Sequence, residues 1–229
     1  MKTFLPVLLL ISMFTAVSCT KEDANTELGG NTDILLTKVD SVSGVYVTYE
    51  GSNIGSTEMK VVSNIKGEVT YTVTMDLNSI PNDLKIKALD LIPKLSQYYK
   101  LGPLTVMPDN KVKMDFTLKI TSEGYLDYFT DGKPWTMIKY EDGVGTQYSI
   151  LNNKGQTVTK TITEKTGIDE WPFAFFNIKT TLVEHVTPSD HPVFNKISYR
   201  MNHRFGLVYI ELELKDGAKV GIDIIAFFA

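Results

Sequence analysis

Alternation of apolar and polar residues dominates the chain from residue 42 onward, and this pattern predicts β-strands. In the segment 69–75, threonines occupy every second position and apolar residues the positions between them. The segment 207–215 alternates in the same way, so one face should meet a core and the other face water. The expected core face is Val208, Ile210, Leu212 and Leu214, and the expected wet face is Tyr209, Glu211, Glu213 and Lys215.

One segment changes from the period of a strand to the period of a helix. Asn78-Ser79 can cap a helix, and Pro81 suits its first turn. Pro93 should kink or split this helix, because proline lacks the N–H donor and clashes with the preceding turn. Apolar residues then recur at three- and four-residue spacing and form a single stripe that should cover the sheet: Leu84, Ala88, Leu91, Leu95 and Tyr98.

The turn sequences between the strands are short, for example Lys66-Gly67 and Asp216-Gly217, and they favour antiparallel hairpins between consecutive strands. The segment 102–110 should cross the surface without a strand, and the segment 164–177 is less regular. The pattern therefore predicts an all-β fold (β-rich α+β). About ten or eleven antiparallel strands would form a meander in a curved sheet, a half-barrel or a barrel, with one covering helix.

The first eighteen residues have a different pattern. Lys2 is followed by an apolar core at residues 4–14, which is too short to cross a bilayer and has the length of a secretory signal. Small and medium residues, Ala16-Val17-Ser18, then precede Cys19, which is the only cysteine of the chain. This arrangement resembles the lipobox of bacterial lipoproteins. The resemblance implies cleavage before Cys19 and attachment of lipid to its thiol.

The residues after the cysteine extend this resemblance. Lys21, Glu22 and Asp23 are similar to the short export signal of surface lipoproteins in Bacteroidota. Residues 19–41 are polar and glycine-containing, which predicts a lipidated flexible tether. We therefore expect a signal peptide at 1–18, the tether at 19–41 and a single β-rich domain at 42–229. The protein would be an outer-membrane lipoprotein that faces the cell surface or the periplasm.

Composition narrows the set of functions. Loss of residues 1–18 leaves 22 basic and 27 acidic residues, because Lys2 is the only charged residue in that segment. A mildly acidic chain without a basic run argues against binding of nucleic acid. A nucleophile elbow, a phosphate loop and a paired Cys-x-x-Cys are all absent from the sequence. We therefore expect no enzymatic activity and no cofactor.

Two groups of polar residues could in principle carry chemistry. His185, His191 and His203 fit no metal-ligand spacing, so incidental histidines are favoured over a metal site. Glu211 and Glu213 would lie about 7 Å apart on one strand face, a separation that occurs in glycosidases. A solvated strand face is the favoured interpretation, because Lys215 continues that face.

Aromatic residues provide the candidate ligand-binding site. Four of them are concentrated around Pro172, and a fifth begins a strand elsewhere: Trp171, Phe173, Phe175, Phe176 and Trp135. They could form a hydrophobic mouth for a lipid tail or a stacking platform for a sugar. They could instead plug one end of a barrel, which is favoured because buried aromatics are common.

Two functions follow from these observations. The first is a membrane-anchored envelope lipoprotein with a non-catalytic binding or structural role, whose partner is an envelope protein, a glycan or an apolar ligand. The alternative is a carrier of an apolar ligand, by analogy of fold with lipocalins and with the half-barrels that carry lipoproteins.

Overall fold

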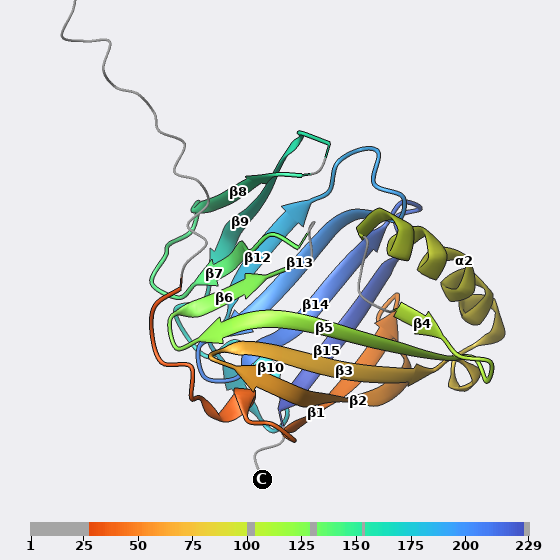
Figure 1. The fold of residues 1–229 in the computed structure, drawn as a ribbon, viewed down its shortest axis with the longest axis horizontal. Coiled ribbons are helices and arrows are strands. Elements are labelled where there is room, and N and C mark those ends of the chain that lie inside the picture. Colours follow the sequence, from red (N-terminus) through yellow and green to blue (C-terminus); the bar gives the residue numbers. More distant parts are fainter. Residues whose placement is uncertain (1–27, 100–103, 129–131, 153, 227–229) are drawn as a thin grey trace, which may run out of the picture.

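The computed structural model describes residues 28–99, 104–128, 132–152 and 154–226 (Figure 1). Two short 3-10 helices, η1 (Leu35–Thr37) and η2 (Leu77–Ser79), accompany the α-helix α2 (Asn82–Tyr99). The strands are β1 (Val42–Tyr49), β2 (Ser52–Ile65), β3 (Glu68–Asp76), β4 (Leu104–Val106), β5 (Lys111–Thr121), β6 (Gly124–Asp127), β7 (Trp135–Lys139), β8 (Gln147–Leu151), β9 (Thr157–Lys165), β10 (Trp171–Phe173), β11 (Phe176–Ile178), β12 (Thr181–Val186), β13 (Phe194–Asn202), β14 (Gly206–Leu214) and β15 (Lys219–Ala226).

These strands build one strongly curved antiparallel sheet. Its order is β7-β6-β5-β3-β2-β1-β15-β14-β13-β12-β9-β8, and β4 pairs with β5. Strands β10 and β11 form a separate two-stranded hairpin. The predicted β-rich fold with one covering helix is therefore confirmed, although the described residues contain more strands than the ten or eleven expected.

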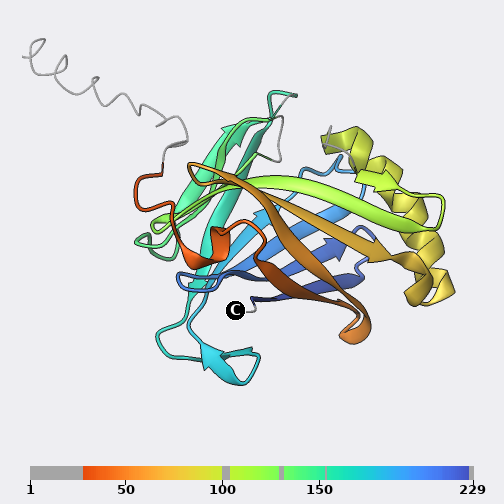
Figure 2. The same ribbon diagram turned by 60° about the horizontal axis from the view of Figure 1, so that its bottom comes forward.

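The two edge strands of the sheet are neighbours in the sequence and also lie close together in space. The indole Nε1 of Trp135 in β7 donates a hydrogen bond of 2.9 Å to the carbonyl oxygen of Tyr148 in β8. The backbone N–H of Lys139 donates to the Tyr148 hydroxyl at 3.0 Å. Figures 1 and 2 show the sheet curling until these edges approach each other. The sheet is thus a nearly closed barrel whose seam lies between β7 and β8.

Helix α2 lies across one end of the barrel, as predicted from its apolar stripe (Figure 1). Leu84 and Ala88 pack against a cluster that contains Val112 of β5. Leu91 and Leu95 pack against a second cluster: Val193, Phe194, Ile197 and Leu214. The helix continues through Pro93 without being split, contrary to one of the two outcomes expected for that proline.

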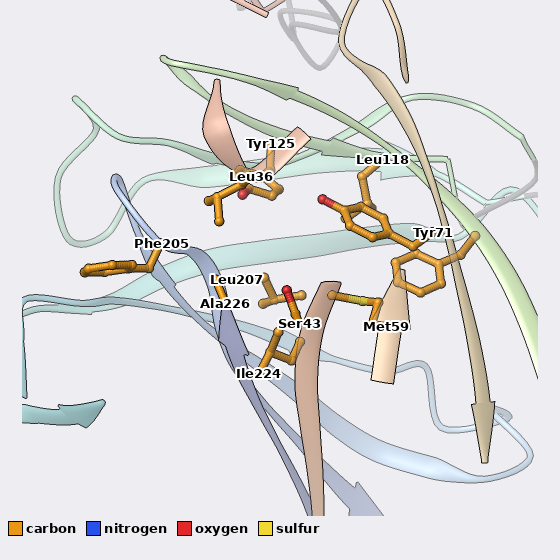
Figure 3. A pocket seen from close by; sticks show the side chains of 11 residues that line it. Leu36, Ser43, Met59, Tyr71, Leu118, Tyr125, Phe205, Leu207, Ile224 and Ala226 are labelled. Atoms are coloured by element: carbon orange, nitrogen blue, oxygen red, sulfur yellow. The ribbon is translucent and has the colours of Figure 1, made fainter. Parts of the chain in front are cut away.

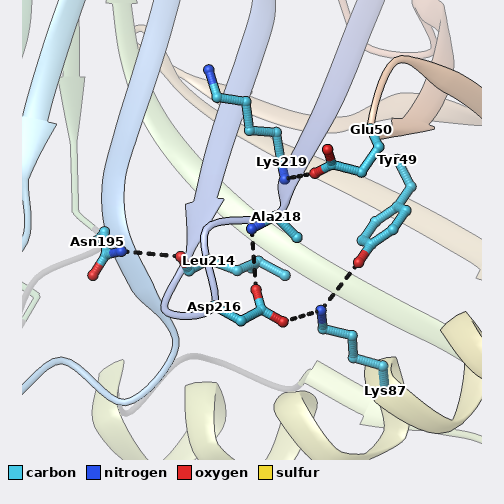
Figure 4. A network of polar contacts seen from close by, with 8 residues as sticks. All are labelled: Tyr49, Glu50, Lys87, Asn195, Leu214, Asp216, Ala218 and Lys219. Carbon is cyan, nitrogen blue, oxygen red and sulfur yellow. Dashed lines mark hydrogen bonds and ion pairs between the residues drawn. The ribbon is translucent and has the colours of Figure 1, made fainter.

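Polar contacts attach α2 to two turns at the rim of the barrel (Figure 4). The Lys87 Nζ lies 2.6 Å from the Asp216 carboxylate, in the turn between β14 and β15. The same ammonium donates to the Tyr49 hydroxyl, at the end of β1, at 3.2 Å. The helix therefore contacts the barrel through apolar residues and through this bridging lysine.

Local features set several element boundaries, and the segment expected to cross the surface without a strand contains one. The turn after β1 contains only Glu50 and Gly51, both with positive φ, which fits a tight hairpin turn and lets β2 begin at Ser52. Residues 104–106 form β4, because they pair with β5. The irregular segment near Pro172 contains the β10–β11 hairpin.

The predicted core face of β14 is wrong at one residue. Arg200 pairs with Tyr209 and Met201 with Leu207, so Val208 is an extra residue in a β-bulge. Val208 packs with Phe173 and Phe205 in a cluster that also includes residues of the β10–β11 hairpin. Leu207 and Ile210 both border the barrel interior, as the bulge requires.

Part of the expected tether lies against the barrel. The backbone N–H of Asn31 donates a hydrogen bond to the Ser122 hydroxyl at 2.9 Å. The backbone N–H of Ser122 donates one to the carbonyl oxygen of Asn31, also at 2.9 Å. The Thr37 side chain is buried, and its hydroxyl donates to the carbonyl oxygen of Ile34 at 2.9 Å. The segment 31–40 therefore packs with the barrel. Residues 19–27 of the expected tether lie outside the described residues.

Candidate ligand-binding site

The barrel interior contains an apolar cavity of about 310 Å³. Strands β5, β7, β13, β14 and β15 provide most of its wall, and α2 contributes Ile92 and Leu95. The side chains that these strands direct into the barrel are mainly aliphatic, thioether or aromatic. They alternate along each strand with side chains that point outward. The wall consists of Ile92, Leu95, Met114, Phe116, Leu118, Asp127, Met137, Phe194, Ile197, Tyr199, Leu207, Ile210, Leu212, Ile222 and Ile224.

A second hollow of about 30 Å³ lies next to the cavity (Figure 3). It shares Phe116, Leu118, Leu207 and Ile224 with the larger cavity, so these side chains separate the two spaces. Its remaining wall comes from other elements, including Leu36 of η1 and Phe205. The packed part of the expected tether thus helps to close the interior.

Among the described residues of the cavity wall, Asp127 is the only charged one, and it forms an ion pair with Lys160 of β9. The side chains of Lys160 and Asp127 are only 1% and 8% exposed. The Lys160 Nζ also lies 3.8 Å from the ring centroid of Trp135, which is a cation–π geometry. Burial lowers the pKa of Lys160, and attraction to Asp127 opposes that change.

A buried histidine completes this polar cluster. The ring of His185 packs edge-on against Trp135 with centroids 5.0 Å apart. Its Nδ1 lies 2.9 Å from the carbonyl oxygen of Thr159. In the tautomer that carries its proton on Nδ1, this nitrogen donates a hydrogen bond to that oxygen. Burial lowers the pKa of His185, and the neighbouring Lys160 charge acts in the same direction. We therefore treat His185 as neutral at pH 7.

The candidate aromatic residues lie in two separate places. Trp135 is buried in the barrel beside Lys160, whereas Trp171, Phe173, Phe175 and Phe176 belong to the β10–β11 hairpin and its turn. Figure 2 shows this hairpin, in cyan, projecting from the barrel away from α2. None of the five residues is part of the wall described for the large cavity.

Contacts of the hairpin aromatics are local. The Trp171 ring lies 5.3 Å from the Tyr209 ring, and the Arg200 guanidinium carbon lies 4.3 Å from the Trp171 centroid. Phe173 is buried against Phe205, with ring centroids 4.7 Å apart. Phe175 is fully exposed at the turn. The hairpin therefore covers the outside of β14 near its bulge.

The other candidate residues show ordinary contacts. Glu211 accepts a hydrogen bond of 3.0 Å from Lys219 on the adjacent strand. The Nδ1 of His191 accepts backbone hydrogen bonds from Val193 at 3.2 Å and Phe194 at 2.8 Å. Burial, and secondarily Lys215, lowers the pKa of His191 to about 4. Within the described ranges, no group of three or more His, Cys, Asp or Glu residues is placed to hold a metal ion.

The residues of the predicted anchor lie outside the described residues: signal peptide 1–18, Cys19, Lys21, Glu22 and Asp23. In the part of the chain that the structure describes, no helix has the length and apolar character needed to span a membrane.

Sequence reasoning missed Asp127 and Lys160. A signal for Lys160 was present, because β9 alternates between threonines on one face and Val158, Lys160 and Ile162 on the other. A lysine between two inward-facing apolar residues indicates a buried charge. No comparable pattern marks Asp127, which ends the short strand β6.

Comparison with known proteins gives two distant structural similarities. No protein-family model and no curated protein sequence matches the chain. A protein of Bacteroides fragilis, predicted to be exported and described with a YmcC-like fold, aligns at a TM-score of 0.43 and 5% identity, over 82% of this chain and 95% of its own. A predicted lipoprotein from Parabacteroides distasonis aligns at a TM-score of 0.42 and 8% identity, over 86% and 98%. Similarities of this size do not assign the chain to a family.

Proposed function

We propose that the protein is a lipid-anchored cell-envelope protein that binds an apolar ligand inside its barrel. The observation that carries this proposal is the apolar cavity of about 310 Å³ beneath α2. Its volume is within the range of small-molecule binding sites, which begins at about 300 Å³. Asp127 and Tyr199 are the only residues with polar side-chain atoms among the described residues of its wall, as expected for a site whose ligand is mainly hydrocarbon.

The size of the cavity also argues against a simple packing defect. Protein interiors are normally filled to crystal-like density. This apolar space of 310 Å³ is about twice as large as an engineered cavity that binds benzene, and it is partly open to solvent, so a ligand can enter it. A ligand that fills the space would restore the lost contacts.

The anchor is inferred from the resemblance of residues 16–19 to a lipobox. Two or three acyl chains on Cys19 would hold the protein on a membrane almost permanently. Because the chain packs with the barrel from about residue 31, only a short segment separates Cys19 from the described residues. The nine residue-to-residue steps from Cys19 to Leu28 span at most about 32 Å when the chain is fully extended. The barrel would therefore stay close to the outer membrane, on its surface or its periplasmic side.

Native mass spectrometry tests the proposal directly. Every described strand and helix follows residue 28, so protein produced from residue 20 onward contains them all. We expect a reproducible mass excess that disappears after extraction with organic solvent. Absence of an excess, together with failure to bind the apolar dye N-phenyl-1-naphthylamine, would contradict the proposal.

A pair of variants locates the bound material. Ile222→Phe adds volume at the cavity wall and should reduce the mass excess and the dye binding. Ile65→Phe makes the same substitution at an exposed position of β2 and should leave both unchanged. Ile210→Phe is a second cavity variant, in case Ile222→Phe does not fold. Equal binding by all of these folded variants would place the ligand elsewhere.

A further inference from the structure

Asp223 places a carboxylate on the outer face of the barrel, away from the ligand cavity. Ile222 and Ile224 line the cavity, so Asp223 between them points to the outside of β15. Asp223 pairs with Tyr46 of β1 on one side and with Tyr209 of β14 on the other. Side chains directly opposite each other in an antiparallel sheet have Cβ atoms about 5 Å apart. We propose that Asp223, Tyr46 and Tyr209 bind the ammonium group of an organic amine.

The charge balance of this face supports a cationic ligand. Two neighbouring carboxylates have a cation of their own, since Glu211 pairs with Lys219 at 3.0 Å and Glu164 with Arg200 at 2.9 Å. Within the part of the chain that the structure describes, the Asp223 side chain makes no hydrogen bond and no ion pair. Partial burial raises the pKa of Asp223, because it removes water from a charge that no protein group compensates. A cation from outside the chain would supply the missing charge.

The aromatic rings beside Asp223 favour a cation as well. The faces of tyrosine rings carry negative potential and attract ammonium groups. Tyr46 is 36% exposed, so a ligand can reach its ring. Trp171 of the β10–β11 hairpin lies 5.3 Å from the Tyr209 ring, but the Arg200 guanidinium already lies over it at 4.3 Å. Trp171 therefore borders the site, and the two tyrosines provide the rings for the ligand.

A glycine of β15 holds the Tyr209 ring next to Asp223. Gly221 lies two residues before Asp223, on the same outward face of the strand. A Cβ at this position would lie 2.7 Å from the Tyr209 hydroxyl and 3.2 Å from its Cε2. The lack of a side chain at Gly221 therefore gives the Tyr209 ring room to lie over β15, within reach of a ligand bound to Asp223.

Three matched probes test the preference for a cation. Ethanolamine, ethylene glycol and glycolate share a two-carbon skeleton with one hydroxyl group, and at neutral pH they are cationic, neutral and anionic. Each is titrated into isotope-labelled protein that begins at residue 20, and binding is followed by the NMR shifts of the backbone amides. We expect saturable shifts at Tyr46, Tyr209 and Asp223 with ethanolamine alone, because only ethanolamine brings a cation to the carboxylate. All three probes are too polar to favour the apolar cavity.

Variants assign the binding to the proposed residues. Asp223→Asn keeps the shape of the side chain but removes its charge, so ethanolamine should bind about tenfold more weakly. Asp83→Asn removes the same charge from the exposed first turn of α2 and should keep the wild-type affinity. This control separates a specific site from general attraction of an amine to an acidic protein. Tyr46→Leu should weaken binding about two- to fivefold, whereas Tyr46→Phe keeps the ring and should not.

Vesicles distinguish two sources of the ammonium group. The protein is sedimented with phosphatidylcholine vesicles that contain or lack phosphatidylethanolamine. Selective retention by the vesicles with phosphatidylethanolamine, lost in Asp223→Asn, would identify a lipid head group as the ligand. Ethanolamine binding without such retention would identify a soluble amine.

Two results would overturn the inference. One is binding of ethylene glycol or glycolate at Asp223 as tight as that of ethanolamine, and the other is equal affinity of Asp223→Asn and Asp83→Asn for ethanolamine. Neither result bears on the proposed function, because the Asp223 side chain and the cavity lie on opposite faces of β15.

Discussion

At the scale of single residues, the buried pair of Lys160 and Asp127 should affect stability far more than the exposed pairs of this protein. Lys160→Met keeps most of the side-chain volume but leaves the Asp127 carboxylate buried without its cation. Loss of one partner of a buried pair typically lowers the free energy of unfolding by about 3–5 kcal/mol. We expect a decrease of this size in urea unfolding at pH 7.

Two comparisons test that explanation. The double variant Lys160→Met/Asp127→Leu leaves no buried charge and should recover most or all of the lost stability. Lys94→Met removes an exposed helical pair with Asp90 and should change the free energy of unfolding by about 0.5 kcal/mol or less. If the double variant is as unstable as the single one, packing and not charge is the cause.

His191 makes stability depend on pH in the weakly acidic range. Its pKa is about 4 in the folded protein, whereas an unfolded histidine titrates near 6.5. Between these values the unfolded state binds more protons, so the free energy of unfolding decreases as the pH falls from about 6.5 toward 4.

His191→Asn should weaken this dependence. An asparagine side chain can still accept hydrogen bonds from nearby backbone N–H groups, but it does not bind a proton in this range. We therefore expect similar stability at pH 7.5 and a smaller loss between pH 6.5 and 5 than in the wild type, measured by urea unfolding at each pH. Part of the dependence should remain, because burial also lowers the pKa of His185. An unchanged slope would contradict the assignment to His191.

At the scale of elements, the β10–β11 hairpin contains two phenylalanines with very different surroundings. Phe173 is 5% exposed and contacts Phe205, while Phe175 is fully exposed at the turn. Phe173→Ala should lower the free energy of unfolding by about 3 kcal/mol, and Phe175→Ala by about 0.5 kcal/mol or less. Neither residue lines the cavity, so the folded variants should bind N-phenyl-1-naphthylamine like the wild type. A large loss of dye affinity in Phe175→Ala would instead indicate that the hairpin takes part in ligand binding.

Periodicity predicted individual elements well where one face is buried and the other wet. The stripe of α2 is an example, because Leu84, Leu91 and Leu95 do pack on the barrel. The bulge at Val208 could not be predicted, since it depends on the register between β13 and β14 and adds no turn residue to the sequence. The hairpin at residues 171–178 was missed because its strands are too short to show alternation.

At the scale of the whole molecule, hairpin turns predicted a meander, and most neighbouring strands in the sheet are indeed consecutive. The sequence left a half-barrel, a barrel and other curved sheets open. Which of these architectures the chain adopts depends on the approach of β7 to β8 and on the pairing of β1 with β15. The cavity could not be predicted either, because its volume is the space left by side chains from strands far apart in the sequence.

The pairing of β1 with β15 determines when the barrel can be completed. Ser43 pairs with Ala226 and Tyr49 with Val220, so the first strand of the sheet has an unpaired edge until the last strand has been synthesised. Contacts between such distant segments form late, because closing a long loop carries an entropic cost before any contact compensates for it. A nascent chain that lacks β15 therefore cannot close its barrel. The local hairpins can form before that step, but the barrel is expected to close only after β15 has been made.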